Sequence, residues 1–336
     1  MPLPPESGPA AGCPLCADPM RRRLVTKNGC EVVRCRGCGL VYVWPQPARE
    51  ALEALYSSGE YHAEVDEAER RRTFARRLRE IETLAPARGR LLDIGCSKGY
   101  FLEAAQASGW QATGVEVNRH AIEAAQARGL DVRHGGLAEQ AFEAACFDAI
   151  ALFDVLEHAD DPRALLAGCR RLLRPGGLLA VTTPDVGGLV PRVTYGLFAL
   201  TLGAWGHPTP PGHLVEFSRR TLRRALGETG FEVVRERSEH IPVAYAAGKL
   251  ENSIMDVLAG RRRQAPTADG RRPAADGRRA SVLRRLPRVG VRATAWAVIG
   301  LAGLAARVAG WGDSTWVIAR AREEPPVFTS NRPHDT

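Results

Sequence analysis

From residue 86 onward, short apolar runs alternate with amphipathic segments of helical period. The apolar runs predict strands over residues 90–95, 111–118, 131–135, 147–154 and 178–185. The amphipathic segments predict helices over residues 98–109, 119–129 and 161–177, each ending in glycine. Because this order alternates strand and helix, it predicts a mainly parallel sheet with helices on both faces. The fold class is therefore α/β and Rossmann-like.

Four of the eight cysteines form two close pairs, Cys13 with Cys16 in CPLC and Cys35 with Cys38 in CRGC. Eighteen residues separate the pairs, a spacing typical of a tetrahedral zinc site. Four thiolates leave no open position, so the predicted Zn²⁺ is structural and its ribbon depends on it for folding. The alternative is a pair of disulfides, but the N-terminal MPLPPESGPAAG lacks the features of a secretory signal. Cys30 is an alternate ligand without a paired spacing.

The net charge of +8 is concentrated in one segment. Residues 261–292 hold eleven Arg against two Asp, a local charge of +9, which leaves −1 for the rest of the chain. Nucleic acid is therefore not the expected partner. The segment repeats ADGRR twice and is expected to be a disordered loop. It is either a solvated spacer or a region attracted to anionic lipid or RNA.

Two apolar runs, Val193–Gly206 and Ala293–Ala306, are each 14 residues long. Both fall short of the roughly 18–20 residues that a membrane-spanning helix needs. They predict buried helices, with contact at a membrane surface as the alternative. The expected location is cytoplasmic, with peripheral membrane contact as an option.

The stretch LLDIGCSKGYF at residues 91–101 predicts a strand that meets a helix at a tight turn. Its glycine spacing fits neither a P-loop nor the dinucleotide GxGxxG pattern. Asp93 at the strand end repels phosphate and suits a cationic ligand. Glu116, at the end of the next strand, can accept both hydroxyls of a ribose. A phosphate-free adenosine ligand with an ammonium group satisfies both acids, and S-adenosylmethionine is such a ligand.

Taken in order, LLDIGCSKGYF, GVEVN, FDAIALFDVLEHADDP, LRPGG, TPD and HLVEFS resemble the class I S-adenosylmethionine-dependent methyltransferases over about residues 86–240. The N-terminal CPLC…CRGCGLVYVWPQP resembles a bacterial subgroup that methylates small molecules, often sugars or their conjugates. The resemblance implies a seven-stranded sheet. Its last helix is expected over residues 218–230, and its final antiparallel strands over 231–239 and 314–321.

This resemblance divides the chain into a zinc ribbon, a helical connector, a core and two insertions. The expected bounds are 10–45 for the ribbon, 46–85 for the connector, 86–240 plus 312–322 for the core, 186–212 for a cap insertion, and 241–311 for a second insertion with the basic loop at 260–285.

In the resembled family the turn after the first strand wraps the methionine part of the cofactor. The implied cofactor-binding residues are Asp93, Gly95, Cys96, Ser97, Gly99, Glu116, Val117, Asp154 and Val155. Ser97 replaces a third glycine found in many members, which loosens the approach of the backbone to the cofactor. GGL at 135–137 stands where an acid often contacts the adenine, so no adenine ligand is assigned.

Two histidines are the predicted catalytic residues. Asp154, Glu157 and His158 are spaced i, i+3 and i+4, so a helical turn would place them on one face. They brace the following helix, or His158 is a general base, or all three hold a divalent ion, as similar groups do in quinone-precursor O-methyltransferases. His213, which opens HLVEFS, is either a base or acceptor contact or a structural histidine.

The predicted function is methyl transfer from S-adenosylmethionine to a small-molecule acceptor, such as a sugar, a glycoconjugate or a lipid-linked intermediate. One alternative is a zinc-ribbon rRNA methyltransferase, although FDVL replaces the Asn/Asp-Pro-Pro-aromatic group used for base amines. A second alternative is a non-catalytic interaction protein on a methyltransferase core.

Overall fold

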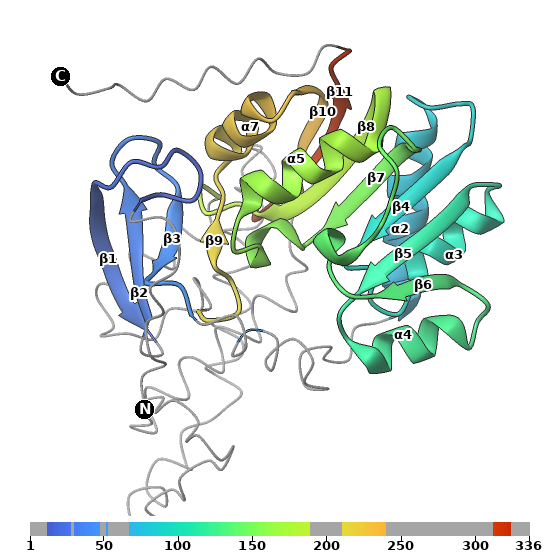
Figure 1. Ribbon diagram of the computed structural model, residues 1–336, viewed down its shortest axis with the longest axis horizontal. Helices are drawn as coiled ribbons and strands as arrows, with labels where there is room; N and C mark the ends of the chain where they lie inside the picture. Colours follow the sequence, from blue (N-terminus) through green and yellow to red (C-terminus); the bar gives the residue numbers. More distant parts are fainter. Residues whose placement is uncertain are drawn as a thin grey trace, which may run out of the picture.

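The structure is a computed structural model that describes residues 12–27, 30–47, 52, 67–188, 210–239 and 312–323. It contains a seven-stranded and a four-stranded sheet (Figure 1). The predicted insertion at 241–311, both 14-residue apolar runs and most of the predicted cap insertion lie outside the described residues. Within the described part of the chain, no helix is long and apolar enough to span a bilayer.

The seven-stranded sheet has the strand order β10-β11-β8-β7-β4-β5-β6. Its strands are β4 (Arg90–Ile94), β5 (Gln111–Glu116), β6 (Asp131–His134), β7 (Phe147–Phe153), β8 (Leu173–Pro184), β10 (Phe231–Glu239) and β11 (Ser314–Ala321). The first five are parallel, and β11 pairs antiparallel with both β8 and β10. This arrangement confirms the predicted Rossmann-like methyltransferase sheet.

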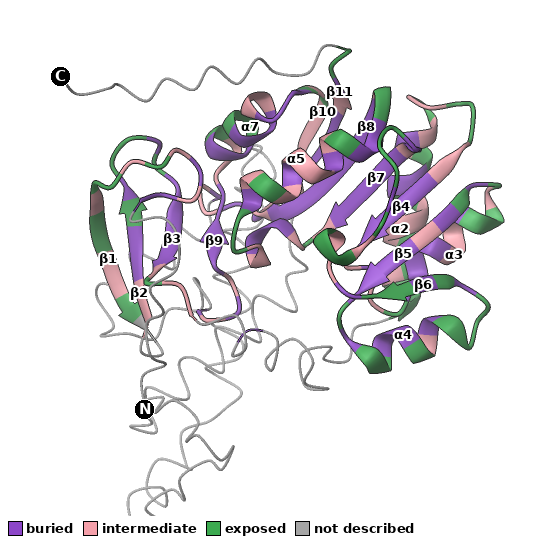
Figure 2. Ribbon diagram, in the orientation of Figure 1, coloured by how far each residue is buried: buried purple, intermediate pink, exposed green. Residues whose placement is uncertain are grey.

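Helices cover both faces of this sheet because alternate strand residues point to opposite sides. The helices are α2 (Glu67–Glu82), α3 (Tyr100–Ala107), α4 (Arg119–Gln126), α5 (Pro162–Leu172) and α7 (Arg219–Glu228). Apolar side chains of α2, α3 and α4 pack in one buried cluster with the sheet, and those of α5 and α7 pack in another. Asn118, Asp161 and Ser218 cap α4, α5 and α7 by accepting backbone N–H bonds. Figure 2 shows the buried strands and the exposed outer faces of the helices.

The boundary between α5 and β8 differs from the prediction. The sequence pattern predicted a helix over residues 161–177, stopped by Pro-Gly-Gly, and a strand from 178. In the structure α5 ends at Leu172 and β8 begins at Leu173, which pairs with Phe147. The register then jumps to Ala149 with Leu178, so residues 174–177 form an irregularity inside the strand. The RPGG sequence therefore interrupts a strand and does not end a helix.

The four-stranded sheet has the order β1-β2-β3-β9. It consists of β1 (Arg21–Lys27), β2 (Cys30–Cys35), β3 (Val41–Trp44) and β9 (Val215–Glu216). The first three strands follow the first cysteine pair, but β9 comes from the segment just before α7. Figure 1 shows β9 between β3 and the rest of the core.

The two sides of the segment 240–311 meet at one place on the sheet. Glu239 pairs with Ser314, and Ser314 pairs with Pro184 at the end of β8. The Asp313 N–H donates to the Glu239 carbonyl at 3.0 Å, and the Asp185 N–H donates to the Asp313 carbonyl at 2.9 Å. The segment therefore leaves and re-enters at the carboxyl end of β8.

Candidate active site

The predicted cofactor residues meet at the carboxyl edge of the parallel strands. β4 lies between β5 and β7, with Ile94 opposite Val115 on one side and Leu152 on the other. The residues that end or follow these strands are therefore neighbours across the sheet. Ligands bind at this edge in open parallel sheets, near the point where the strand order reverses.

The turn after β4 needs glycine for two reasons. Gly95 has a φ of 72°, and a Cβ at this position would lie 2.5 Å from Cγ2 of Val155. Gly99 has a φ of 78° and caps α3 through its backbone alone. Ser97, where the resembled family often has glycine, also has a positive φ of 49°. The turn keeps the left-handed conformation with a serine, at a cost of order 1 kcal/mol in backbone strain.

The Glu116 carboxylate holds this turn in place. One oxygen accepts the Ser97 N–H at 2.8 Å, and the other accepts the N–H groups of Val117 and Asn118 at 2.8 and 2.9 Å. A carboxylate has about four acceptor positions, so these bonds leave room for one more on the oxygen that faces Ser97. Sequence analysis assigned Glu116 to a ribose alone. In the structure it also ties the β4 turn to the start of α4.

The Asp93 carboxyl is buried, with 3% of the residue exposed, and no described residue donates a hydrogen bond to it. Burial raises the pKa of Asp93 well above its usual value, and the neighbouring Glu116 raises it further. A cationic ligand would compensate this buried acid. Val117 is 42% exposed, an apolar side chain next to the Glu116 carboxylate. These residues fit a positively charged nucleoside without phosphate.

Cys96, also assigned to the cofactor, is 6% exposed. Burial raises the pKa of its thiol, and Asp93 and Glu116 add to the effect. A buried, protonated thiol is a poor nucleophile. Cys96 therefore contributes packing at this turn, and its sulfur lies where a Cβ on Gly114 would have to go.

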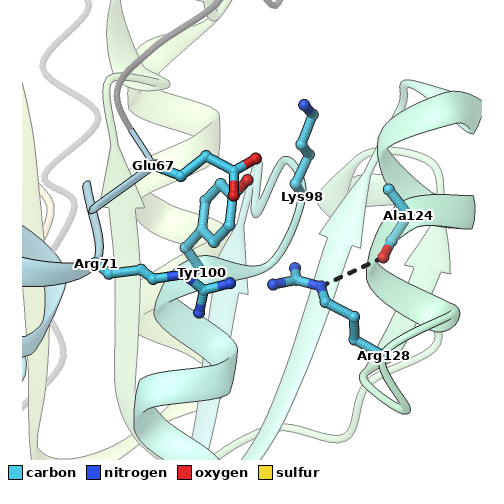
Figure 3. A pocket seen from close by; sticks show the side chains of 6 residues that line it. All are labelled: Glu67, Arg71, Lys98, Tyr100, Ala124 and Arg128. Carbon is cyan, nitrogen blue, oxygen red and sulfur yellow. Dashed lines mark hydrogen bonds between the residues drawn. The ribbon is translucent and has the colours of Figure 1, made fainter. Parts of the chain in front are cut away.

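A cleft of about 250 Å³ opens beside the turn (Figure 3). Its lining residues are Glu67, Arg71, Lys98, Tyr100, Ala124 and Arg128. Arg71 and Arg128 both pair with Glu103, and each guanidinium lies over the Tyr100 ring, at 4.8 and 4.9 Å. These contacts tie the first turn of α3 to α2 and to the turn that follows α4. They stabilise α3, the helix that begins at the predicted cofactor turn, residues 95–99.

Asp154 follows β7 in a left-handed conformation with a φ of 56°. Thr182 of β8 holds it there, because the Asp154 N–H donates to the Thr182 carbonyl at 2.9 Å. The Thr182 hydroxyl also donates to the Asp154 carboxylate at 3.1 Å. The sequence grouped Asp154 with Glu157 and His158, but Asp154 is outside the metal-sized group that the structure forms. None of the three caps α5, whose N-cap is Asp161.

Both predicted catalytic histidines lie together. His158 ends η3 (Leu156–His158), and His213 precedes β9. Their ring centroids are 4.9 Å apart and the rings are nearly perpendicular, at 85°. The Leu214 N–H donates to the Glu157 carbonyl at 2.9 Å, which joins the two segments through the backbone.

The pKa values of the two imidazole rings are shifted in opposite directions. The His158 Nδ1 lies 2.6 Å from the Gly212 carbonyl, to which it donates as the N–H tautomer, and Nε2 is then left with a lone pair. Burial, reinforced by the neighbouring His213, lowers the pKa of His158 to about 4. Burial alone would also lower the pKa of His213. The nearby carboxylates raise it above its usual value instead, with Glu216 having the largest effect and Glu157 and Asp154 smaller ones.

Two buried acids complete this cluster. Glu216 is 4% exposed, and its carboxylate lies 3.4 Å from the His213 Nδ1. Glu157 is 1% exposed, and burial raises its pKa to about 8. Ligand atoms of Glu157, His158 and His213 all lie within 4.8 Å of one another, close enough to share an ion. Glu216 was missed in the sequence, although its i, i+3 spacing from His213 was visible in HLVEFS.

The four predicted zinc ligands also come together. The Sγ atoms of Cys13 and Cys38 are 3.5 Å apart, as are those of Cys16 and Cys35. A tetrahedral zinc with Zn–S bonds of about 2.3 Å would place its sulfurs about 3.8 Å apart. The N–H of Cys38 points at the Cys35 sulfur at 3.4 Å, as in a knuckle. Cys30 is outside this cluster. The cluster is thus compatible with a bound zinc ion.

Comparisons with known proteins agree with this geometry. A family model described as a methyltransferase domain matches residues 67–236, half of the chain. A probable S-adenosylmethionine-dependent methyltransferase of Mycolicibacterium smegmatis is 30% identical over 165 residues, 48% of this chain and 57% of that protein. A ubiquinone biosynthesis O-methyltransferase of Xylella fastidiosa is 37% identical over 115 residues, 32% of this chain and 47% of that protein.

The chain thus spans about half the length of the curated relatives it matches. Among solved structures, a SAM dependent methyltransferase from Archaeoglobus fulgidus aligns with a TM-score of 0.46 and 18% identity, covering 74% of this chain and 94% of that one. From the family match and the strand order, the chain belongs to the class I S-adenosylmethionine-dependent methyltransferases.

Proposed function

We propose that this protein transfers the methyl group of S-adenosylmethionine to a hydroxyl of a small-molecule acceptor. The observation that carries the proposal is a pair of half-buried histidines, His158 and His213, whose rings are in contact at the carboxyl edge of the sheet and whose pKa values are shifted in opposite directions. S-adenosylmethionine would supply an electrophilic methyl group on a sulfonium, which an acceptor oxygen attacks in line.

The cofactor would be held by the residues around the β4 turn. Asp93 provides a negative charge for its cationic end, and Gly95 and Gly99 let the backbone approach closely. Glu116 has one acceptor position left for a ribose hydroxyl, and Val117 offers an exposed apolar surface for the base. The four-cysteine cluster would hold a structural Zn²⁺ that takes no part in the chemistry.

The histidine pair suits an acceptor that must lose a proton. His158 is neutral near pH 7, so its imidazole can accept the hydroxyl proton. His213, with its raised pKa, can place a positive charge beside the oxygen as negative charge develops on it. A base whose pKa is about 4 holds a proton weakly, which favours an acidic hydroxyl such as a phenol or enol.

A small molecule is favoured over RNA by charge. Outside residues 261–292 the chain carries a net −1, whereas RNA binding needs a basic surface. Some relatives are named as ubiquinone biosynthesis O-methyltransferases, which supports an oxygen acceptor. Phenols, sugars, glycoconjugates and lipid-linked intermediates therefore form the acceptor panel, with rRNA as the contrasting arm.

The decisive variant is His158→Asn. Asparagine keeps an N–H near the position of the imidazole Nδ1, so the bond to the Gly212 carbonyl can persist, but it has no base at Nε2. We expect turnover with radiolabelled methyl donor to fall by about 10²–10⁴-fold while cofactor affinity is unchanged. The matched control is His120→Asn on the surface of α4, where the side chain is 81% exposed. Full turnover in His158→Asn would remove His158 from the mechanism.

A divalent ion is the second candidate, favoured by the cluster of Glu157, His158 and His213. An imidazole whose Nδ1–H donates to a carbonyl is also oriented as metal-ligating histidines are. Strong chelation tests this alternative. Activity that survives a chelator, or that only Zn²⁺ restores, argues for the base, and activity that returns with Mg²⁺ or Mn²⁺ after chelation argues for the ion. A failure to bind cofactor in calorimetry would support the non-catalytic alternative.

A further inference from the structure

The strand that carries the His213 cluster pairs with the cysteine-bearing ribbon. β9 is only two residues long, and both pair with β3: Val215 faces Tyr42, and Glu216 faces Val41. The Val43 N–H donates to the Leu214 carbonyl at 2.9 Å. Since such a short strand is not stable alone, its position depends on its partner. Glu216 therefore lies in a ladder that the ribbon completes, and His213 lies just before it.

Leu214 links the ribbon to the other histidine. Its carbonyl accepts from Val43 of the ribbon, and its N–H donates to the Glu157 carbonyl of η3, at 2.9 Å each. The backbone thus runs as one hydrogen-bonded series from β3 through β9 to η3, which ends at His158. A displacement of β3 would move both sides of the histidine pair.

The cysteine turn determines where β3 begins. The Cys35 N–H donates to the Leu40 carbonyl at 2.9 Å, and the Leu40 N–H points at the Cys38 sulfur at 3.4 Å. Leu40 is fully buried, and the next residue is the first of β3. On the opposite turn, Arg163 of α5 donates to the Leu15 carbonyl at 3.0 Å. An ion that fixes the four sulfurs therefore also fixes the start of β3.

The ribbon and the core share one apolar interior. Leu15, Leu40 and Tyr42 belong to the same buried cluster as Val215 and Phe217. By contrast, Cys96 of the turn after β4 and Phe101 and Leu102 of α3 pack with α2 and α4 in the second cluster. Ile94 and Val115, at the ends of β4 and β5, belong to the first. Loss of order in the ribbon should therefore reach the histidine pair before the cofactor turn.

We propose that the four-cysteine metal site positions the acceptor-side histidine, because bound metal orders β3, β3 pairs with β9, and β9 places Glu216 against His213. Glu216 is a positioning residue in this arrangement. The inference rests on the proposed function for its catalytic meaning, but its structural part is measurable without an acceptor. The ribbon then does more than stabilise the chain, since it completes the acceptor half of the site.

Two variants test the coupling from different sides. Cys38→Ser removes a metal ligand, and Cys30→Ser is its matched control in the same ribbon, outside the cluster. Val43→Pro removes the N–H that donates to the Leu214 carbonyl and leaves all four cysteines in place. Each protein is measured for zinc content, cofactor affinity by calorimetry, and amide exchange in the peptide covering residues 213–217.

We expect Cys38→Ser and the chelated wild type to lose zinc, and Val43→Pro to retain it. All three should bind S-adenosylhomocysteine within about twofold of the wild type, while exchange at residues 213–217 rises several-fold, since a lost ladder bond is worth about 1 kcal/mol. Cys30→Ser should match the wild type. Unchanged exchange in the zinc-free protein overturns the proposal, and so does loss of cofactor binding, because the ribbon would then support the whole fold.

Glu216→Gln separates positioning from folding. We expect it to keep zinc, cofactor affinity and exchange protection, and to lower kcat at least about tenfold without raising the KM for the acceptor, since the His213 ring loses its charged partner. A kcat equal to that of the wild type would remove Glu216 from this role. If the zinc-loaded wild type methylates no acceptor while the exchange results hold, the proposed function fails and the positioning by the ribbon stands.

Discussion

Replacement of Glu116 by glutamine tests the central assumption about the cofactor turn. The carboxylate accepts three backbone N–H bonds, at 2.8, 2.8 and 2.9 Å, from residues on both sides of the site. A glutamine has only one acceptor oxygen. If that oxygen stays on Val117 and Asn118, the new NH₂ group faces the Ser97 N–H, and the bond that holds the turn is lost.

The magnitude follows from these contacts. A hydrogen bond to a charged group contributes about 1.5–3 kcal/mol, and Glu116 is only 6% exposed, so solvent cannot replace it. We expect Glu116→Gln to lower the free energy of unfolding by about 2 kcal/mol. The variant would also remove the carboxylate that accepts from the cofactor and loosen the turn after β4 on which the cofactor would rest. The Kd of the cofactor should therefore rise by at least about tenfold, which equals about 1.4 kcal/mol.

Urea unfolding and calorimetry with S-adenosylhomocysteine measure both quantities. The matched control is Glu123→Gln on α4, whose side chain is 73% exposed and lies 3.8 Å from His120. The control should change neither quantity, because an exposed ion pair contributes little. A Kd for Glu116→Gln within twofold of the control would refute the assignment of this carboxylate to the cofactor.

Three further predictions concern the same edge of the sheet. The pKa of Asp93 is raised, so binding of a cationic cofactor should release the Asp93 proton, and cofactor affinity should increase with pH. Calorimetry in two buffers of different ionisation enthalpy should detect this proton release, and Asp93→Asn should abolish it. Gly95→Ala should weaken cofactor binding and cost about 1–3 kcal/mol of stability in urea unfolding, and adding Val155→Ala should restore only part, because the left-handed φ remains. The pKa of His158 is lowered to about 4 in the folded state, so between about pH 4 and 6.5 the unfolded chain binds the His158 proton more readily than the folded chain does. The free energy of unfolding should therefore rise with pH by up to about 3 kcal/mol across this window. Denaturation curves taken at several pH values measure this rise, and His158→Asn should flatten it.

The sequence predicted the central sheet well because local signals were strong there. FDAIALFD is nearly continuous in apolar residues, as a strand buried on both faces requires, and β7 spans Phe147–Phe153. Gly109 and Gly129 marked the turns before β5 and β6, and both have positive φ values. Cysteine spacing likewise predicted a cluster that the structure brings together.

Long-range pairing was what the sequence could not reveal. β9 has two residues, and its partner β3 lies more than a hundred residues earlier in the chain. A strand this short has no periodic pattern from which it, or its pairing with β3, could be predicted. Glu216 was missed for the same reason, since its burial depends on that pairing. The shift of the α5 end from 177 to Leu172 has a similar origin. An amphipathic pattern continues through Leu173, but pairing with Phe147 draws that residue into β8.

The adjacency of Glu239 and Ser314 at the end of β8 has an evolutionary consequence. Because the flanking strands already hold the two ends together, changing the length of the chain between them alters loop-closure entropy only slightly. Segments of different lengths between Glu239 and Ser314 should therefore be tolerated without a change in the register of the flanking strands. Such an insertion would leave and re-enter at the carboxyl end of β8, the edge of the sheet where the proposed acceptor site lies, so the proposed substrate range could diversify without a change in the turn after β4.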